Sequence, residues 1–110
     1  MYTYVQYISD HGEDVFQVNN QASHTETQGT YPMYDVPFVL WTSEEFNNNN
    51  TRNYDFSRKY MLDDLIHSIA DLSGIKFKGF EPQRSIFSDL FTNRKRVIFN
   101  NMEYDSIFKR

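Results

Sequence analysis

The sequence predicts an α/β or α+β fold, and three observations lead to this prediction. Two short runs of β-branched and aromatic residues lie in the first half of the chain, at 3–9 and 36–42. A strongly periodic helix pattern follows at 61–72, and two apolar runs separated by Asn100-Asn101 close the chain. Strands, a helix and a hairpin in this order are typical of a domain that combines a sheet with helices.

The composition limits the size and the class of the protein. With 110 residues, the chain has the common size of one domain, so we expect a single structural unit, 1–110. Hydrophobic residues make up 39% of the chain and aromatic residues 17%, too many for a disordered segment. The absence of Cys excludes disulfides and thiolate metal sites. A net charge of −4 argues against nucleic acid as a partner, and no apolar run is long enough to span a membrane.

The charge is unevenly distributed along the chain. Residues 1–75 carry 3 basic and 11 acidic side chains, whereas residues 76–110 carry 8 basic and 4 acidic ones. The basic residues of the second part would suit either phosphate binding or pairing with the acidic first part, and we favour the pairing. The residues concerned are Arg84, Arg94, Lys95 and Arg96.

The first predicted strand ends at a sharp turn. The run 3–9 has no clean alternation, which suits a strand covered on both faces, as in a parallel or mixed sheet. It stops at Asp10-His11-Gly12, where Gly permits the chain to reverse. The polar stretch at 13–34 is unusually long for a compact domain unless it has a function.

Residues 61–72 give the clearest helix pattern of the chain. Apolar residues recur there with the i, i+3, i+4, i+7 spacing of one helix face, and we interpret this stripe as packing. Gly74 follows at the place where a left-handed C-cap is expected. The stripe consists of Leu62, Leu65, Ile66, Ile69 and Leu72.

Two further segments are marked by Asn. Segment 47–53 begins with a tract of four Asn residues, and since such a tract has nothing to bury, we expect a mobile surface loop. Asn100 and Asn101 tolerate positive φ, and the apolar-bearing runs on both sides of them predict a C-terminal β-hairpin.

Three residues are candidates for a metal site. Asp10 and His11 follow the first strand, at the edge where ligands of open α/β sheets gather, and Zn²⁺ accepts carboxylate and imidazole together. His24, in the polar stretch, would add a third ligand for one metal or two. The spacing alone does not decide, because Asp-His-Gly is also a good turn sequence and a loop His is usually only solvated.

Together these motifs resemble the sulfatase-type branch of the alkaline phosphatase superfamily, and within it the bacterial phosphoethanolamine transferases. The turn Ser-Asp-His-Gly-Glu at 9–13, the loop with His24 and the Val-Pro-aliphatic-Trp strand at 36–41 are similar to the family's pattern. The helix at 63–75 resembles a late helix of the family, and 84–88 resembles its closing segment.

The resemblance implies a doubly wound α/β/α domain with a zinc site at the carboxyl edge of its sheet. Asp10 and His11 would bind zinc or another divalent metal, and His24 would contact a second metal or the substrate phosphate. Thr25 follows His24 where relatives often have Gly. The family's Thr nucleophile and its other ligands lie upstream of these motifs, so the resemblance implies a C-terminal part of a catalytic domain that binds metal weakly and is inactive alone.

By the same resemblance, the parent enzyme would move phosphoethanolamine from a phospholipid to a lipopolysaccharide sugar or lipid, at the periplasmic face of the bacterial inner membrane. The chain itself is expected to be soluble. Two alternatives stay open: a fragment of another sulfatase-type hydrolase, and a non-catalytic binding module on the same scaffold. Because such a piece would leave sheet edges without neighbours, we also expect a homodimer formed through these edges.

Overall fold

The structure, a computed structural model, describes residues 3–15, 22–23, 30–50, 52 and 54–108. Its internal contacts divide the chain into two compact units. Unit 1 contains residues 1–51 and 97–110, and unit 2 contains residues 52–96. The expected single unit is thus built from two parts, one made by both ends of the chain and one by its middle.

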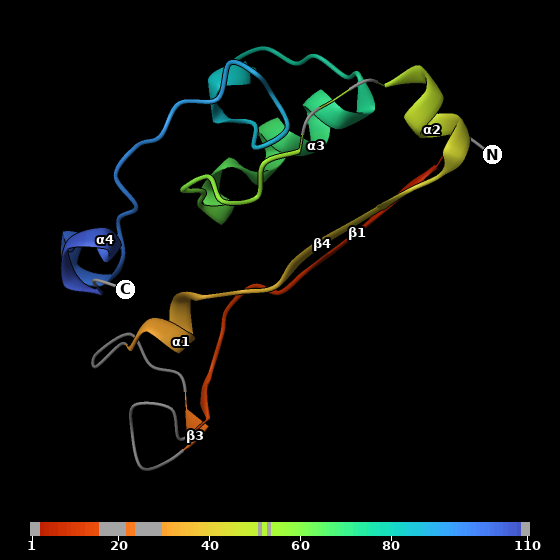
Figure 1. Ribbon diagram of the computed structural model, residues 1–110. Helices are drawn as coiled ribbons and strands as arrows, with labels where there is room; N and C mark the ends of the chain where they lie inside the picture. Colours follow the sequence, from red (N-terminus) through yellow and green to blue (C-terminus); the bar gives the residue numbers. More distant parts are fainter. Residues whose placement is uncertain (1–2, 16–21, 24–29, 51, 53, 109–110) are drawn as a thin grey trace. The chain divides into compact units, whose positions relative to one another are not determined.

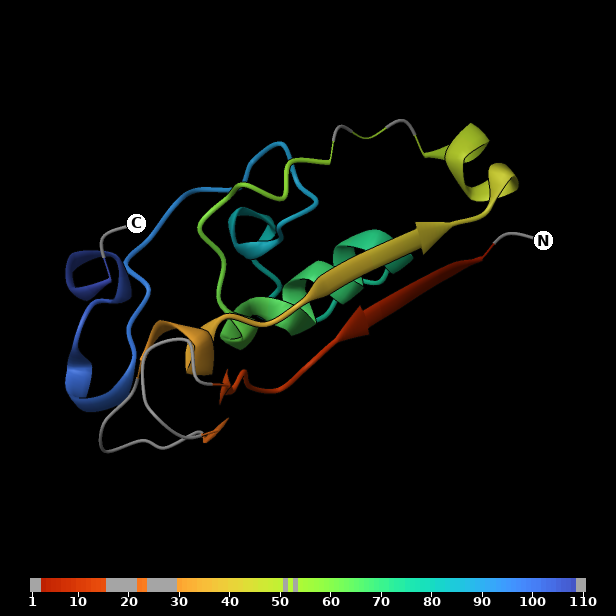
Figure 2. The same cartoon turned by 60° about the horizontal axis from the view of Figure 1, so that its bottom comes forward.

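The main sheet of unit 1 pairs the two predicted strands, β1 (Tyr4–Ile8) and β4 (Phe38–Thr42), in antiparallel register (Figures 1 and 2). Both strands alternate between half-buried and exposed side chains, so the ladder has one covered face and one open face. The expectation that β1 is covered on both faces is therefore not met within this chain. The open face carries four apolar side chains that are each more than half exposed, namely Val5, Tyr7, Val39 and Trp41.

The connection between β1 and β4 contains a second, smaller ladder and a short helix. β2 (Asp14–Val15) pairs with β3 (Ala22–Ser23) in antiparallel register. The helix α1 (Tyr31–Tyr34) is a single turn that begins with Pro32 near its N-terminus, where the fixed φ of proline favours a helix. Pro32 and Met33 are buried, so this turn belongs to the core of unit 1.

The helix α2 (Glu44–Asn49) follows β4 directly and is fixed to the start of β1. The Ser43 hydroxyl caps the helix by accepting from the backbone N–H of Phe46 at 3.2 Å, and it also accepts from the N–H of Thr3 at 3.0 Å. Phe46 is 1% exposed and packs edge-on against the ring of Tyr4, with 5.6 Å between ring centroids.

The Asn-rich segment differs from the loop expected over 47–53. Residues Asn47–Asn49 form the last turn of α2, because the cap at Ser43 starts a helix that continues through the tract. The Asn49 side chain donates to the carbonyl of Glu45, four residues earlier, at 2.8 Å. Part of the segment lies outside the described residues, and its mobility stays a prediction.

The predicted C-terminal hairpin is reduced to one bridge. Val97 and Glu103 form an isolated antiparallel bridge around η3 (Phe99–Asn101), in which both Asn residues have positive φ, 61° and 58°. The turn predicted from the two Asn residues is therefore confirmed. The run after it forms the helix α4 (Tyr104–Ile107) instead of a second strand, and it buries the Tyr104 ring against aromatic side chains of α1.

Unit 2 is built on the predicted helix. This helix consists of a first turn, η1 (Leu62–Asp64), which is continued by α3 (Leu65–Ser73). Gly74 ends α3 in the left-handed conformation, with φ 71°, and its N–H is bonded to the carbonyls of Ala70 and Asp71. The C-cap predicted at this glycine is confirmed. A second short turn, η2 (Pro82–Arg84), lies beside α3.

The buried face of α3 is not the predicted apolar stripe. Ile66 is 60% exposed and Ile69 40%, whereas His67 is 5% and Ser68 0% exposed. Of the stripe, only Leu72 is fully buried. The interpretation of the stripe as packing is therefore wrong for the two isoleucines in this chain, and the buried face of the helix combines two polar residues, His67 and Ser68, with Ala70 and Leu72.

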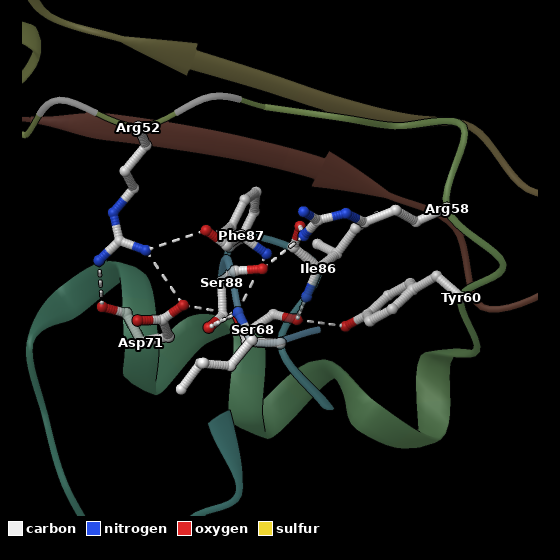
Figure 3. Close-up of polar contacts among 10 residues, drawn as sticks. Arg52, Arg58, Tyr60, Ser68, Asp71, Ile86, Phe87 and Ser88 are labelled. Atoms are coloured by element: carbon white, nitrogen blue, oxygen red, sulfur yellow. Dashed lines mark hydrogen bonds and ion pairs between the residues drawn. The ribbon is translucent and has the colours of Figure 1, made fainter. Parts of the chain in front are cut away.

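The polar face of α3 is buried because it binds the irregular segment 85–88 (Figure 3). The Ser68 hydroxyl accepts from the N–H of Ile86 at 3.1 Å and shares a 2.7 Å hydrogen bond with the hydroxyl of Tyr60. Burial raises the pKa of Tyr60 to about 12, so this hydroxyl stays protonated at neutral pH. Arg58 donates to the carbonyl of Ile86 at 2.8 Å from the other side.

A second arginine closes the same segment. Arg52 donates to the Asp71 carboxylate at 3.0 Å, to the Asp71 carbonyl at 3.1 Å and to the Phe87 carbonyl at 3.2 Å. The Ser85 hydroxyl donates to the same Asp71 carboxylate at 2.7 Å. Figure 3 shows Arg52 beside Asp71. Backbone carbonyls without a place in a helix or sheet thus receive their hydrogen bonds from guanidinium groups.

The charge pairing predicted for the basic second part is confirmed for two arginines. Asp64, which is 3% exposed, accepts from Arg84 and from Arg94, each with an N–O distance of 2.6 Å. A carboxylate can be buried to this extent because two guanidinium groups replace the water it loses.

Replacing Ser68 by Ala should lower the free energy of unfolding by about 1–3 kcal/mol, because the buried N–H of Ile86 and the Tyr60 hydroxyl lose their shared partner. Denaturant unfolding of the full chain measures this change. The exposed Ser106, replaced in the same way, is the matched control and should shift the curve little. An unchanged midpoint for Ser68→Ala would contradict the role given to the polar face.

Candidate metal centre

The turn after β1 presents the two predicted ligands to solvent. Residues 9–12 leave the ladder, and the Ser9 hydroxyl donates to the carbonyl of His11 at 2.8 Å, which closes the turn. The side chains of Asp10 and His11 are 90% and 45% exposed. A cation can therefore reach both groups without a rearrangement of the core.

Asp10 and His11 point toward each other. The distance between His11 Nε2 and Asp10 Oδ1 is 3.7 Å. Tetrahedral zinc holds nitrogen and oxygen ligands at about 2.0–2.1 Å, which places two ligand atoms about 3.3 Å apart. The two side chains are thus already close to the spacing that one shared ion requires.

The imidazole of His11 is oriented by a hydrogen bond to the backbone. Its Nδ1 lies 2.9 Å from the carbonyl oxygen of Gly12, and since a carbonyl only accepts, Nδ1 is the donor of this bond. Nε2 is the ring nitrogen that lies on the side of Asp10. A backbone carbonyl that binds the other ring nitrogen is a common way in which proteins orient a metal-binding His.

Gly12 fixes the turn against α1. Its N–H donates to the carbonyl of Met33 at 2.8 Å, and a Cβ at this position would overlap with the carbonyl oxygens of Pro32 and Asp35. Only glycine allows this approach. Sequence reasoning treated Gly12 as a turn residue and missed α1 as its support, although the Pro at the start of a short helix was a visible signal.

The other histidines are not brought to this turn by the described residues. His24 lies outside them. His67 is 5% exposed in α3, where its Nδ1 accepts from the N–H of Glu81 at 3.1 Å, so it has a packing role. Within the described part of the chain, no group of three or more His, Cys, Asp or Glu side chains is arranged to hold a metal ion. No helix among these residues is long and apolar enough to cross a bilayer.

The sulfatase family profile matches residues 2–75, a span that includes the Asp10-His11 turn, β4 and α3. The chain belongs to the sulfatase family. This membership confirms the resemblance that the turn, the Val-Pro-aliphatic-Trp strand and the helix predicted.

Two curated relatives of this sulfatase-family chain are phosphoethanolamine transferases. EptC of Escherichia coli K12 is 39% identical to it over 98 residues, and CptA of Salmonella typhimurium LT2 is 40% identical over 98 residues. Each alignment covers 86% of this chain but 17% of the relative. The chain therefore spans about a sixth of the length of these transferases.

Two solved structures share the fold. The C-terminal periplasmic domain of EcEptC from Escherichia coli is 34% identical, with a TM-score of 0.86, and the match covers 94% of this chain and 32% of that domain. A complex of the same domain with Zn is 35% identical, with a TM-score of 0.82, and covers 93% of this chain and 30% of the domain. The α/β, sulfatase-like fold predicted from the sequence is confirmed.

The variant Gly12→Ala should destabilise unit 1 by about 1–3 kcal/mol or more, because the added Cβ has to displace backbone of α1. The same displacement should weaken zinc binding at the turn. Thermal unfolding and zinc titration measure the two effects. Gly79→Ala is the control. An added Cβ there meets no atom within 4 Å, so the φ of 93° is the one source of strain in this variant. Wild-type stability and affinity in Gly12→Ala would refute the close approach.

Proposed function

We propose that this chain is the metal-binding portion of the catalytic domain of a phosphoethanolamine transferase, with Asp10 and His11 as zinc ligands. The observation that carries the proposal is the 3.7 Å spacing of Nε2 and Oδ1 at the end of β1, with the His11 ring oriented by the Gly12 carbonyl. The names of the relatives EptC and CptA and the zinc complex of the EptC domain support it.

His24 is proposed as the contact to a second metal or to the substrate phosphate. It follows directly after Ser23, whose partner in the β2–β3 ladder is Asp14. The ladder therefore returns the chain to within three residues of His11 just before His24 is reached. This return of the chain supports a role for His24 beside the Asp10-His11 pair.

The proposed roles divide the chemistry between the metal and the protein. Zinc, when bound, would neutralise charge on phosphoryl oxygens and lower the pKa of an attacking hydroxyl. Asp10 would supply a negative ligand, and His11 a neutral one that binds through Nε2 while its Nδ1–H donates to the Gly12 carbonyl. Gly12 would hold both ligands at a fixed distance from α1.

The proposed substrates of the parent enzyme are a phospholipid as donor and a lipopolysaccharide sugar or lipid as acceptor, at the periplasmic face of the inner membrane. This chain does not contain the family's nucleophile motif, so we propose that it is inactive alone. A Thr nucleophile elsewhere in the same polypeptide would favour the transferase, and a Cys or Ser in a Cys/Ser-x-Pro-x-Arg motif would favour a sulfatase-type hydrolase. The absence of both motifs from the polypeptide would favour a non-catalytic binding module.

Zinc titration of the full chain by calorimetry tests the ligand assignment. Asp10→Ala and His11→Ala should each weaken binding at least about tenfold, since even the loss of a group that only supports a ligand costs about 10–100-fold. Asp63→Ala removes an exposed carboxylate in η1 and is the matched control, with wild-type affinity expected. Equal affinities in all four proteins, or no saturable binding by the wild type, would remove the site.

We also propose that the isolated chain forms a homodimer through the β1/β4 sheet. The open face carries two cross-strand apolar pairs, Val5 with Trp41 and Tyr7 with Val39, all more than half exposed. Among the described residues no third strand joins this two-stranded sheet, so its outer edges also offer backbone groups to a second copy. The same apolar patch on both copies allows a two-fold interface.

Trp41→Lys should shift the chain toward monomer, because it places a charge at the centre of the apolar patch. Sedimentation velocity over a range of concentrations measures the shift, and the fluorescence of the single Trp of the wild type should move to the blue as the dimer forms. Ile66→Lys changes an equally exposed apolar residue of α3 and should leave the dimer intact. A wild type that stays monomeric at high concentration refutes the dimer.

A further inference from the structure

The turn at residues 9–12, which carries the proposed ligands and is called the metal turn below, is positioned by α1. This helix is too short to be stable without tertiary contacts. α1 has four residues, and a helix of one turn has no stability of its own in water. Yet the Met33 carbonyl of α1 receives the Gly12 N–H, and the carbonyls of Pro32 and Asp35 border the Gly12 Cα. Whatever holds α1 in place therefore also places Gly12, and with it the carbonyl that orients His11.

The contact that holds the end of α1 comes from the other end of the chain. Asp35 is the C-cap of α1, and its carboxylate accepts a short hydrogen bond from the hydroxyl of Tyr104 in α4, 69 residues away in the sequence. Tyr104 is 7% exposed. A hydrogen bond from a buried hydroxyl to a carboxylate is among the stronger ones in proteins.

The ring of Tyr104 has a separate role from its hydroxyl. It packs edge-on against Tyr34 of α1, with 6.5 Å between centroids, and against Phe108, at 5.1 Å. Phe108 in turn contacts the ring of Tyr31, at 6.4 Å. These ring contacts keep α4 on α1, whereas the hydroxyl bond ties α4 to the C-cap residue of α1.

We propose that Tyr104 and Asp35 are positioning residues of the metal turn: their hydrogen bond sets α1, and α1 sets Gly12 and the orientation of His11. This inference rests on the proposed function, since it assigns the two residues to the Asp10-His11 site. Neither residue touches the metal in the proposal. Their effect is transmitted through the Gly12 N–H to Met33 O bond and through the Gly12 carbonyl on His11 Nδ1.

The variant Tyr104→Phe separates positioning from folding. It keeps the aromatic contacts and removes only the hydroxyl, and Asp35 remains an exposed residue whose carboxylate water can solvate. We expect unit 1 to stay folded. In the full chain, zinc affinity should fall about tenfold, as for other residues that support a metal-binding His.

A second readout does not need the metal. Amide hydrogen exchange by NMR follows the Gly12 N–H, bonded to Met33 O, and the Ser43 N–H, bonded to Thr3 O at the far end of the β1/β4 ladder. In Tyr104→Phe, Gly12 should exchange about tenfold faster while Ser43 is unchanged. A merely structural role would accelerate both amides alike and leave the zinc affinity of the folded chain as it was.

Tyr34→Phe is the matched control, because Tyr34 belongs to the same aromatic cluster but its hydroxyl makes no hydrogen bond among the described residues. It should change neither readout. Asp35→Ala removes the acceptor and should reproduce the effect of Tyr104→Phe, and the double variant should be no worse than either single one, since both remove the same bond.

The two proposals fail in different ways. If Gly12 exchange in Tyr104→Phe rises no more than that of Ser43, or zinc affinity is unchanged, the positioning role is overturned while the ligand assignment stands. If the wild type binds no zinc through His11, the proposed function is overturned. Tyr104 and Asp35 then have no metal site to position. Faster exchange at Gly12 together with weaker zinc binding supports the positioning role.

Discussion

The approach of Gly12 to the carbonyls of α1 is the constraint on which the metal turn depends. A strand end is normally free to fray, and two neighbouring side chains on extended backbone would diverge. Here the N–H of Gly12 is tied to Met33, and its Cα is enclosed by Pro32 and Asp35. The turn is therefore fixed by tertiary contact, and the convergence of Asp10 and His11 is a consequence of it.

The features that the sequence predicts correctly have local causes. β-branched and aromatic runs predict β1 and β4, a 3.6-residue period predicts α3, and the backbone freedom of Gly74 predicts its C-cap. The candidate pair at 10–11 could be named for the same reason, because the end of a strand, a turn residue and two ligand types are adjacent in the chain. Each of these features depends on residues that are neighbours in the sequence. It can therefore be predicted without knowledge of the fold.

The features that the sequence does not predict are set by distant contacts. The periodic pattern of α3 marks an apolar face, but the face that is buried in this chain carries Ser68 and His67, because the N–H groups of Ile86 and Glu81 supply them with partners. The helix α4 stands in place of the second strand of the hairpin, and its Tyr104 donates a hydrogen bond to Asp35, 69 residues earlier. Neither hydrophobic periodicity nor secondary-structure propensity predicts a contact between residues as far apart in the sequence as Tyr104 and Asp35.

The carboxylates of Asp64 and Asp71 in unit 2 already have structural partners, and they are unsuited to bind a metal ion. Four-coordinate zinc needs two donors besides the proposed ligands Asp10 and His11, whereas His24 is proposed to contact a second metal or the substrate phosphate. Asp64 and Asp71 are each held by arginines, and recruiting either would break a buried ion pair at a cost of about 3–5 kcal/mol. Both carboxylates therefore serve the packing of unit 2: Asp71 binds Arg52 and Ser85, which hold the irregular segment 85–88 on α3, and Asp64 binds Arg84 and Arg94.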